Sequence, residues 1–116
     1  SGGAGRQRGG MGLRRVYRAE RDCRVAVAGS RHKYAPWGLD GGLPGGMGAL
    51  RFGPGTTPFT GNSGPLKAGD IIEVITPGAG GYGDPRARSP ELVLEDLRAG
   101  NIDLETARAV YSFNPA

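Results

Sequence analysis

The sequence predicts an α+β fold, mainly β with glycine-rich loops and two short C-terminal helices. Three observations support this prediction. Residues 71–76 form an apolar run typical of a strand covered on both faces. The run leads into residues 78–83, a loop composed almost entirely of glycine. Residues 89–111 then carry the capping residues and the apolar periodicity of two helices.

Two further strands are expected near the N-terminal end. Residues 13–19 and 23–28 have strand-like composition and flank the charged turn Glu20-Arg21-Asp22, so we expect them to pair as a hairpin. Cys23 alternates with arginine and aligns with two valines, which indicates a buried structural thiol. A single cysteine excludes an internal disulfide and a cysteine-based zinc cluster.

The middle of the chain lacks the signals of regular structure. Glycine and proline recur every few positions between residues 30 and 65, which excludes a long helix or a central strand there. We therefore expect a long irregular excursion. Loops of this length are usually functional or packed on another surface.

The helix signals define a boundary between residues 1–88, a glycine-rich β region, and residues 89–116, a helical hairpin. Ser89 is a predicted N-cap, Pro90 occupies the first helical position and Gly100 ends the first helix. Asp103 is the predicted cap of the second helix. The expected apolar stripes comprise Val93, Leu94 and Leu97 in the first helix and Leu104, Ala107, Val110 and Tyr111 in the second.

The composition favours a chain that depends on neighbours. Of 116 residues, 23 are glycine and 9 are proline, and only 37% are hydrophobic, so little side-chain volume is left for a core. Two helices of this length are also marginal in water by themselves. We therefore expect the chain to be part of a larger assembly.

The charge distribution raises one alternative function. The first 51 residues contain ten Arg or Lys against three acidic residues, whereas the rest contains five against eight. A stand-alone nucleic-acid-binding module could use such a basic half. No recognition helix or aromatic single-strand motif accompanies it, so we favour arginines that face solvent or pair with an acidic partner surface. The arginines of this alternative are Arg6, Arg8, Arg14, Arg15 and Arg18.

The glycine loop invites comparison with phosphate-binding loops because it follows a strand. No Gly-Lys-Ser/Thr follows it, and Asp84-Pro85 interrupts the chain where a helix N-terminus would be needed. We therefore expect a tight turn that lets this segment pack against another backbone.

Residues 31–38 hold the only histidine and the only tryptophan of the sequence. His32 has the chemistry of a general base or metal ligand, but a lone histidine is more often structural. We interpret Trp37 as a packing anchor, and Arg31 with Lys33 as either a carboxylate clamp or a solvated charge run.

Acidic residues do not suggest a reaction centre. Glu95 and Asp96 are expected on the exposed face of the first helix, and Asp70 and Asp84 are typical turn residues. The spacing of the potential ligands matches no metal site. The predicted binding residues are therefore Arg8, Arg31, His32, Trp37 and Tyr82, with no catalytic and no metal-binding residue.

Several motifs occur in a fixed order along nearly the whole chain: residues 1–12, 36–45, 67–70 and 76–85, followed by the helix that opens at Pro90. Together they resemble the C-terminal region of the hydantoinase B/oxoprolinase family. Two positions depart from the family pattern. Ala35 stands where a second proline is usual before the Trp-Gly pair, and His32 stands where an arginine is frequent.

The resemblance implies part of an ATP-dependent enzyme that opens cyclic amides such as hydantoins or 5-oxoproline. The alternative is an ATP-dependent ketone carboxylase of the acetone or acetophenone type. ATP and a divalent metal are expected on partner subunits, with none on this chain. The implied partners are the remainder of the hydantoinase B-type subunit, together with a hydantoinase A-type ATP-binding subunit. This chain is expected to have a structural and site-shaping role and to be inactive alone.

Family members are several times longer than this chain. We expect a separate small subunit, a cleavage product beginning at Ser1, or a fragment. The sequence contains no signal peptide, no long apolar span and no lipidation motif, which predicts a cytoplasmic location without membrane attachment.

Overall fold

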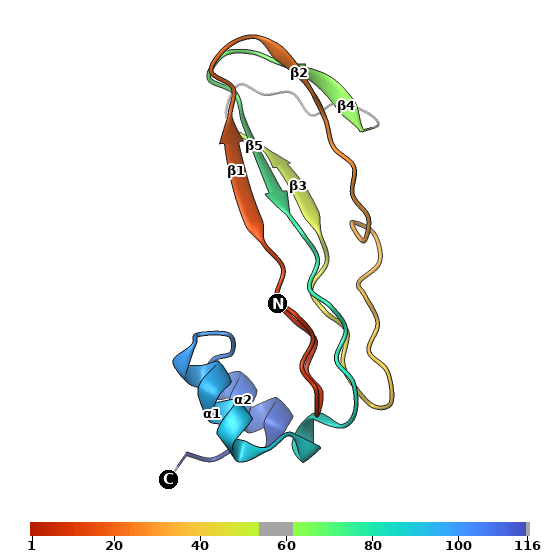
Figure 1. Cartoon of the computed structure of the whole chain (residues 1–116), viewed down its shortest axis with the longest axis vertical. Helices are drawn as coiled ribbons and strands as arrows, with labels where there is room; N and C mark the ends of the chain where they lie inside the picture. Colours follow the sequence, from red (N-terminus) through yellow and green to blue (C-terminus); the bar gives the residue numbers. More distant parts are fainter. Residues whose placement is uncertain (54–61, 116) are drawn as a thin grey trace.

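The computed structural model describes residues 1–53 and 62–115. The molecule is elongated, with extents of 54 × 27 × 16 Å. Strands lie at one end, helices lie at the other, and glycine-rich segments run between them (Figure 1). Its radius of gyration is 17.7 Å, whereas a compact domain of this length has about 13 Å. The predicted α+β class is confirmed.

The strands form two small antiparallel sheets. β1 (Arg14–Arg18) and β3 (Ala49–Phe52) flank β5 (Ile71–Ile75), giving the order β1-β5-β3. β2 (Cys23–Ala26) pairs with β4 (Ser63–Leu66). The strand predicted from the apolar run is therefore present as β5, and it is the central strand of its sheet.

The predicted hairpin between residues 13–19 and 23–28 is wrong. β1 pairs with β5 and β2 pairs with β4, so the two N-terminal strands lie in different sheets. The reason is a bend in one long ribbon: Ala19 donates to the carbonyl of Asp70 and accepts from Gly69, which has a φ of +90°. Asp22 accepts hydrogen bonds from Lys67 and the Ala68 amide across this bend. The expected turn is thus a corner shared by two chain segments.

The expectation of an irregular excursion over residues 30–65 is wrong in two places. Both β3 and β4 lie within it. Each has only four residues, and its partner strand is distant in sequence, so local composition does not reveal it. The part of the excursion at residues 54–61 lies outside the described residues.

Three glycine-rich segments, residues 1–12, 36–48 and 76–83, pack side by side as a rod between the sheets and the helices (Figure 1). Their hydrogen bonds join different segments. Leu43 donates to the carbonyl of Ala4 over 2.7 Å, and the Gly81 amide donates to the carbonyl of Leu43 over 2.9 Å. The Gly3 amide closes the set by donating to Ala79 over 2.8 Å. Each segment therefore bonds to both of the others.

Glycine is required in the rod because the backbones nearly touch. A Cβ added at Gly81 would lie 2.1 Å from the carbonyl oxygen of Ala4, and one at Gly80 would lie 1.8 Å from that of Trp37. At Gly78 the carbonyl oxygen of Ser1 would be 1.9 Å away. Only glycine lets backbones approach this closely, as in the collagen triple helix. The prediction that the glycine loop packs against another backbone is confirmed.

The helices begin where the sequence predicts. After the short 3₁₀ helix η1 (Pro85–Ala87), Ser89 caps α1 (Pro90–Arg98) and Asp103 caps α2 (Leu104–Tyr111). Their shared core consists of Val93, Ala107 and Tyr111, against which Ala4 of the rod also packs. No helix in residues 1–53 and 62–115 has the length and apolarity needed to cross a membrane.

Gly81→Ala is expected to destabilise the protein by about 1–3 kcal/mol, because the rod must shift to admit the methyl group. Gly10→Ala is the matched control in the same rod, since a Cβ there meets nothing within 4 Å. Urea unfolding followed by circular dichroism measures both free energies of unfolding. Equal stability of the two variants would contradict the close-packing explanation.

Candidate functional site

The glycine-rich loop at residues 78–83 uses its backbone amides within the chain. The amides of Gly78, Ala79 and Gly81 donate to Gly46, Gly10 and Leu43, and those of Tyr82 and Gly83 donate to Gln7 and Leu39. A phosphate-binding loop needs such amides to be free to face the anion. This loop is therefore committed to holding the rod together, which agrees with the preference for a packed turn.

Residues 31–37 form an exposed loop that we call the aromatic loop. The guanidinium of Arg31 lies 4.7 Å from the centroid of the Trp37 ring, within the range of a cation–π contact. Lys33 lies 5.5 Å from the ring of Tyr34. The interpretation of Trp37 as a packing anchor is wrong for this chain, because 65% of Trp37 is exposed. Its backbone packs on the rod, whereas its ring projects from it.

The aromatic loop is held in one shape at both ends. Arg31 has a φ of 63°, a left-handed conformation that is uncommon for residues other than glycine. Its carbonyl accepts from the Gly48 amide over 2.9 Å, and the carbonyl of Pro36 accepts from Gly45 over 2.9 Å. A loop fixed before binding loses less conformational entropy when it meets a partner.

His32 lies in the same loop but has no catalytic neighbours among the described residues. Its Nε2 approaches Gly29, where an added Cβ would be 2.9 Å away. It borders a hollow of about 530 Å³ that Val27 and Leu50 also line. No group of three or more His, Cys, Asp or Glu that could hold a metal occurs in residues 1–53 and 62–115. The described residues therefore do not fit a divalent metal site.

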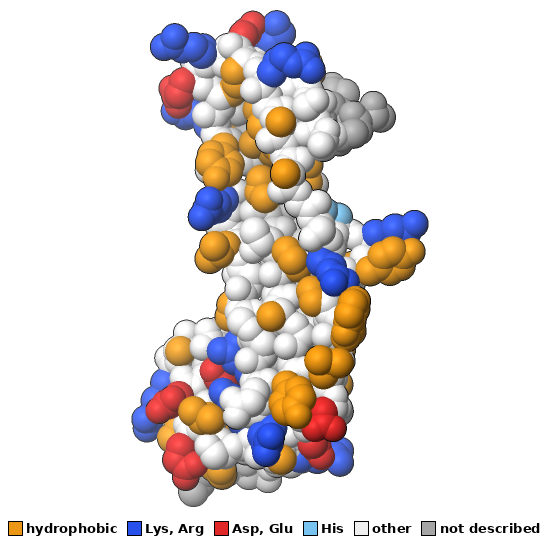
Figure 2. Space-filling view, turned by 45° about the vertical axis from the view of Figure 1, so that its right-hand side comes forward, with side chains coloured by type: hydrophobic (Ala, Val, Ile, Leu, Met, Phe, Trp, Pro, Cys, Tyr) orange, Lys and Arg blue, Asp and Glu red, His pale blue; other side chains and the backbone are white. Residues whose placement is uncertain are grey.

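Tyr82 takes part in the rod through its backbone. It exchanges hydrogen bonds with Gln7 in both directions and forms a parallel bridge with Leu39. Its side chain is 46% exposed. Tyr82 is thus an apolar surface position of the rod, and Figure 2 shows hydrophobic side chains gathered along one side of the molecule.

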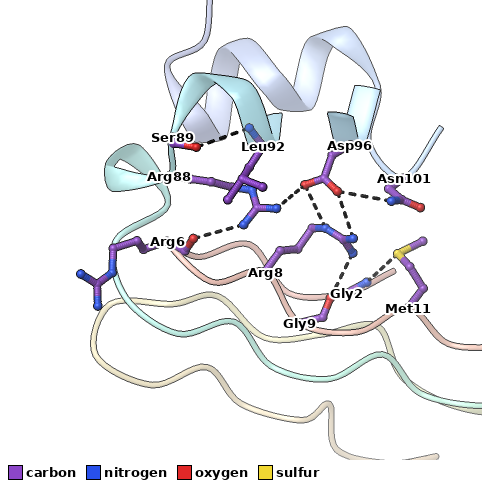
Figure 3. Close-up of polar contacts among 10 residues, drawn as sticks. All are labelled: Gly2, Arg6, Arg8, Gly9, Met11, Arg88, Ser89, Leu92, Asp96 and Asn101. Carbon is purple, nitrogen blue, oxygen red and sulfur yellow. Dashed lines mark hydrogen bonds and ion pairs between the residues drawn. The ribbon is translucent and has the colours of Figure 1, made fainter. Parts of the chain in front are cut away.

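Arg8 belongs to a separate, buried cluster that joins the rod to α1 (Figure 3). Its guanidinium donates through Nε to one carboxylate oxygen of Asp96 at 3.1 Å, and its Nη2 lies 3.0 Å from the other oxygen. Arg88 donates to the same carboxylate over 2.9 Å and to the carbonyl of Arg6 over 3.1 Å. We call Arg8, Arg88 and Asp96 the arginine–aspartate cluster.

The prediction that Asp96 lies on the exposed face of α1 is wrong, because only 5% of it is exposed. The helical period placed Asp96 on a polar face, but that face packs against the rod, where two guanidinium groups receive the carboxylate. Glu95, its neighbour in the predicted acidic pair, remains exposed. The sequence signal available was the pair of arginines at 8 and 88, which nothing local connects to residue 96.

Burial by itself raises the pKa of Asp96, but its partners outweigh burial. Hydrogen bonds from Arg8 and Asn101 and the charges of both arginines hold the pKa below its usual value. One carboxylate facing two guanidinium groups leaves the cluster with an excess of positive charge. Arg88 Nε is buried without a hydrogen-bond partner among the described residues. The cluster is a buried fastening between segments distant in the sequence.

The structure separates the five predicted binding residues into three places. Arg8 lies in the buried cluster, Tyr82 lies on the rod, and Arg31, His32 and Trp37 share the aromatic loop. No nucleophile, base and orienting group come together among them. The described residues offer surfaces for contact and do not form a reaction centre.

The arginines of the nucleic-acid alternative are largely engaged within the chain. Arg8 is paired with Asp96, Arg14 is paired with Glu73, and Arg18 lies 2.9 Å from Glu20. Neutralised arginines release fewer counterions on binding a polyanion, so the pairing weakens this alternative.

The expectation of a buried thiol at Cys23 is wrong for this chain, because Cys23 is exposed. Val25 and Val27, which continue the same alternation, are only partly buried. The alternation correctly indicates an apolar face. No described residue of the chain covers Cys23 on that face.

Fold and site together define a glycine-packed α+β module that presents surfaces for contact. Residues 1–85 match the family described as Hydantoinase B/oxoprolinase. The chain belongs to this family, as its glycine motifs indicated.

Individual relatives agree with this membership. The chain is 41% identical to an uncharacterized protein of Methanocaldococcus jannaschii over 115 residues, which is 96% of this chain and 20% of the relative. It is 36% identical to a Pseudomonas protein named, by inference, as the B component of a D-/L-hydantoinase, over 92% of this chain and 19% of the relative. It is 36% identical to 5-oxoprolinase 1 of Arabidopsis thaliana over 72% of this chain and 7% of the relative. The chain thus spans about a fifth of the length of the first two relatives.

Asp96→Asn is expected to lower the free energy of unfolding by about 3–5 kcal/mol at pH 7, because two arginines remain buried without their anion. Glu95→Gln is the matched control on the same helix and should change stability by less than about 0.5 kcal/mol. Urea unfolding followed by helical circular dichroism measures both. Equal effects of the two substitutions would contradict the fastening role.

The cluster also predicts a pH dependence. The depressed pKa of Asp96 means that its stabilising contribution is present above the unfolded pKa of about 3.9 and is lost as pH falls through the folded value. The stability difference between the unsubstituted chain and Asp96→Asn should therefore shrink below about pH 4. A difference that stays constant from pH 7 to pH 3 would show that the carboxylate charge does not contribute.

Proposed function

We propose that this chain is a structural and site-shaping part of an ATP-dependent cyclic amide hydrolase of the hydantoinase/oxoprolinase type. In this proposal ATP and a divalent metal are held by a hydantoinase A-type subunit, which phosphorylates the substrate. Ring opening is completed by the remainder of the hydantoinase B-type subunit. The assembly works in the cytoplasm. This chain by itself is inactive.

Family membership is the observation that carries the proposal, and the site explains the division of labour. Residues 1–53 and 62–115 hold no metal-ligand cluster, and the glycine loop has committed most of its amides to the rod. ATP chemistry therefore has to come from elsewhere in the assembly. What this chain contributes is a rod held by backbone contacts and the surfaces that the rod carries.

The exposed surface supports a chain that works inside an assembly. It amounts to 7602 Å², whereas a compact monomer of 12.0 kDa exposes about 6,000 Å². Large side chains contribute to it along the rod and the aromatic loop, among them Leu39, Leu43 and Met47. Exposed apolar surface of this kind is typical of interaction sites.

Reconstitution tests the function directly. The chain alone, and the chain with its hydantoinase A-type and B-type companions, are incubated with ATP, Mg²⁺ and either hydantoin or 5-oxoproline. Ring-opened product and ADP are quantified by liquid chromatography. We expect both products only from the complete assembly. Ring opening by the isolated chain would overturn the supporting role.

Two arms of the same experiment test the alternatives. Acetone or acetophenone with bicarbonate replaces the cyclic amide, and ATP consumption with these ketones alone would favour the carboxylase alternative. A gel shift with DNA and RNA at low and moderate salt tests the nucleic-acid module, and salt-sensitive binding without any enzymatic turnover would favour it.

Trp37→Ala is expected to weaken association with the companion subunits by about 2 kcal/mol, roughly 30-fold in Kd, because exposed tryptophans held in place are typical interface anchors. The fold of the chain should be unaffected, since the ring is largely exposed. Leu104→Ala on α2 is the control for loss of any exposed apolar side chain. Binding is measured by surface plasmon resonance. Equal weakening by both substitutions would contradict a specific role for the aromatic loop.

A further inference from the structure

The bent ribbon encloses a groove between the two sheets. Strand register places Tyr17 and Phe52 beside Ile72 on one face of the three-stranded sheet, because paired residues point to the same side. By the same rule Cys23 and Leu66 share a face of the two-stranded sheet. Between these faces lies a groove of about 410 Å³, lined mainly by apolar side chains that include Tyr17, Cys23, Val25, Val27, Leu66 and Ile72.

The described residues leave this groove uncovered. Of its lining residues only Leu66 and Ile72 are buried, whereas Tyr17 and Cys23 are exposed. Exposed apolar area costs about 25 cal/mol per Å² relative to burial, so a concave apolar surface favours an occupant.

The opposite face of the three-stranded sheet is different. Glu73 on β5 pairs with Arg14 of β1 and Arg51 of β3, so charged groups from all three strands satisfy one another there. Val16 lies on this face opposite Glu73 and is half exposed. The outer face is therefore suited to water, and the inner face is not.

We propose that the groove seats an apolar segment, flanked by acidic residues, from the polypeptide that forms the rest of the hydantoinase B-type subunit. This inference rests on the proposed function. The chain spans about a fifth of the length of its first relatives, so a long companion polypeptide is available to supply the segment. The acidic flank is complementary to Arg24, which lines the groove and has no ion pair among the described residues.

The available area suits such an interface. The exposed surface of 7602 Å² exceeds that of a compact monomer by about 1,600 Å². One partner contributes only about 800 Å² to a standard interface, so the surplus is sufficient. The alternation of Cys23, Val25 and Val27 points the same way, because such a pattern is typical of a strand face that is covered.

Cys23 provides a direct probe because it lines the groove and is the only cysteine of the chain. The isolated chain and the assembly of the chain with the remaining B-type polypeptide are treated with N-ethylmaleimide, and peptide mass spectrometry follows modification at Cys23. We expect rapid modification in the isolated chain. In the assembly the rate should fall at least about tenfold, since a covered thiol reacts only when the contact opens locally.

Matched substitutions separate the groove from the rest of the ribbon. Val25→Asp places a charge in the groove and should weaken binding of the remaining polypeptide at least about tenfold, because an unpaired charge is costly to bury. Val16→Asp places the same charge on the outer face beside Arg14 and should leave binding within about twofold. Circular dichroism confirms that both variants keep their strands and helices.

The outcomes distinguish this inference from the proposed function. An assembly that opens cyclic amides with ATP while Cys23 stays fully reactive overturns the groove proposal and leaves the function standing. Protection of Cys23 in an assembly that shows no ATP-dependent ring opening supports the groove and overturns the function. Protection that rises with concentration in the isolated chain assigns the groove to a second copy and overturns the proposal.

Discussion

Contact between bare backbones is the constraint on which the rest of this structure depends. Gly78, Gly80 and Gly81 lie so close to neighbouring carbonyl groups that a single added carbon would collide with them. The three segments of the rod then satisfy one another's amides and carbonyls. Each such hydrogen bond contributes about 1 kcal/mol net, so many are needed to replace a conventional core. The small apolar cluster around Val93 seals one end of this arrangement.

The rod explains how a chain with few buried side chains can still present ordered surfaces. Its backbone is occupied inward, so its side chains, among them Trp37 and Tyr82, are left to face outward. The arginine–aspartate cluster fixes the rod to α1, and the bend at Ala19 and Asp70 fixes the direction in which the ribbon folds back. The sheets, helices and aromatic loop are therefore positioned relative to one scaffold.

The parts of the fold that depend on neighbouring residues were predictable from the sequence. Ser89 and Asp103 cap their helices as expected, and β5 follows from its apolar run, because these signals act within a few residues. The pairing of β1 with β5 and the burial of Asp96 were not predictable, since both depend on partners distant in the chain. The candidate site divides similarly. The contact of Arg31 with Trp37 is local, whereas the role of Arg8 required knowledge of where α1 lies.

The arginine–aspartate cluster also bears on how the protein is made. Arg8 and Asp96 are 88 residues apart in the sequence, and the first rod segment likewise waits for the last one. Contacts between such distant residues form slowly because a long loop must close first. On the ribosome, the earliest glycine segment therefore emerges long before the residues that order it. Translation must run nearly to the end of this sequence before its oldest part can acquire its shape.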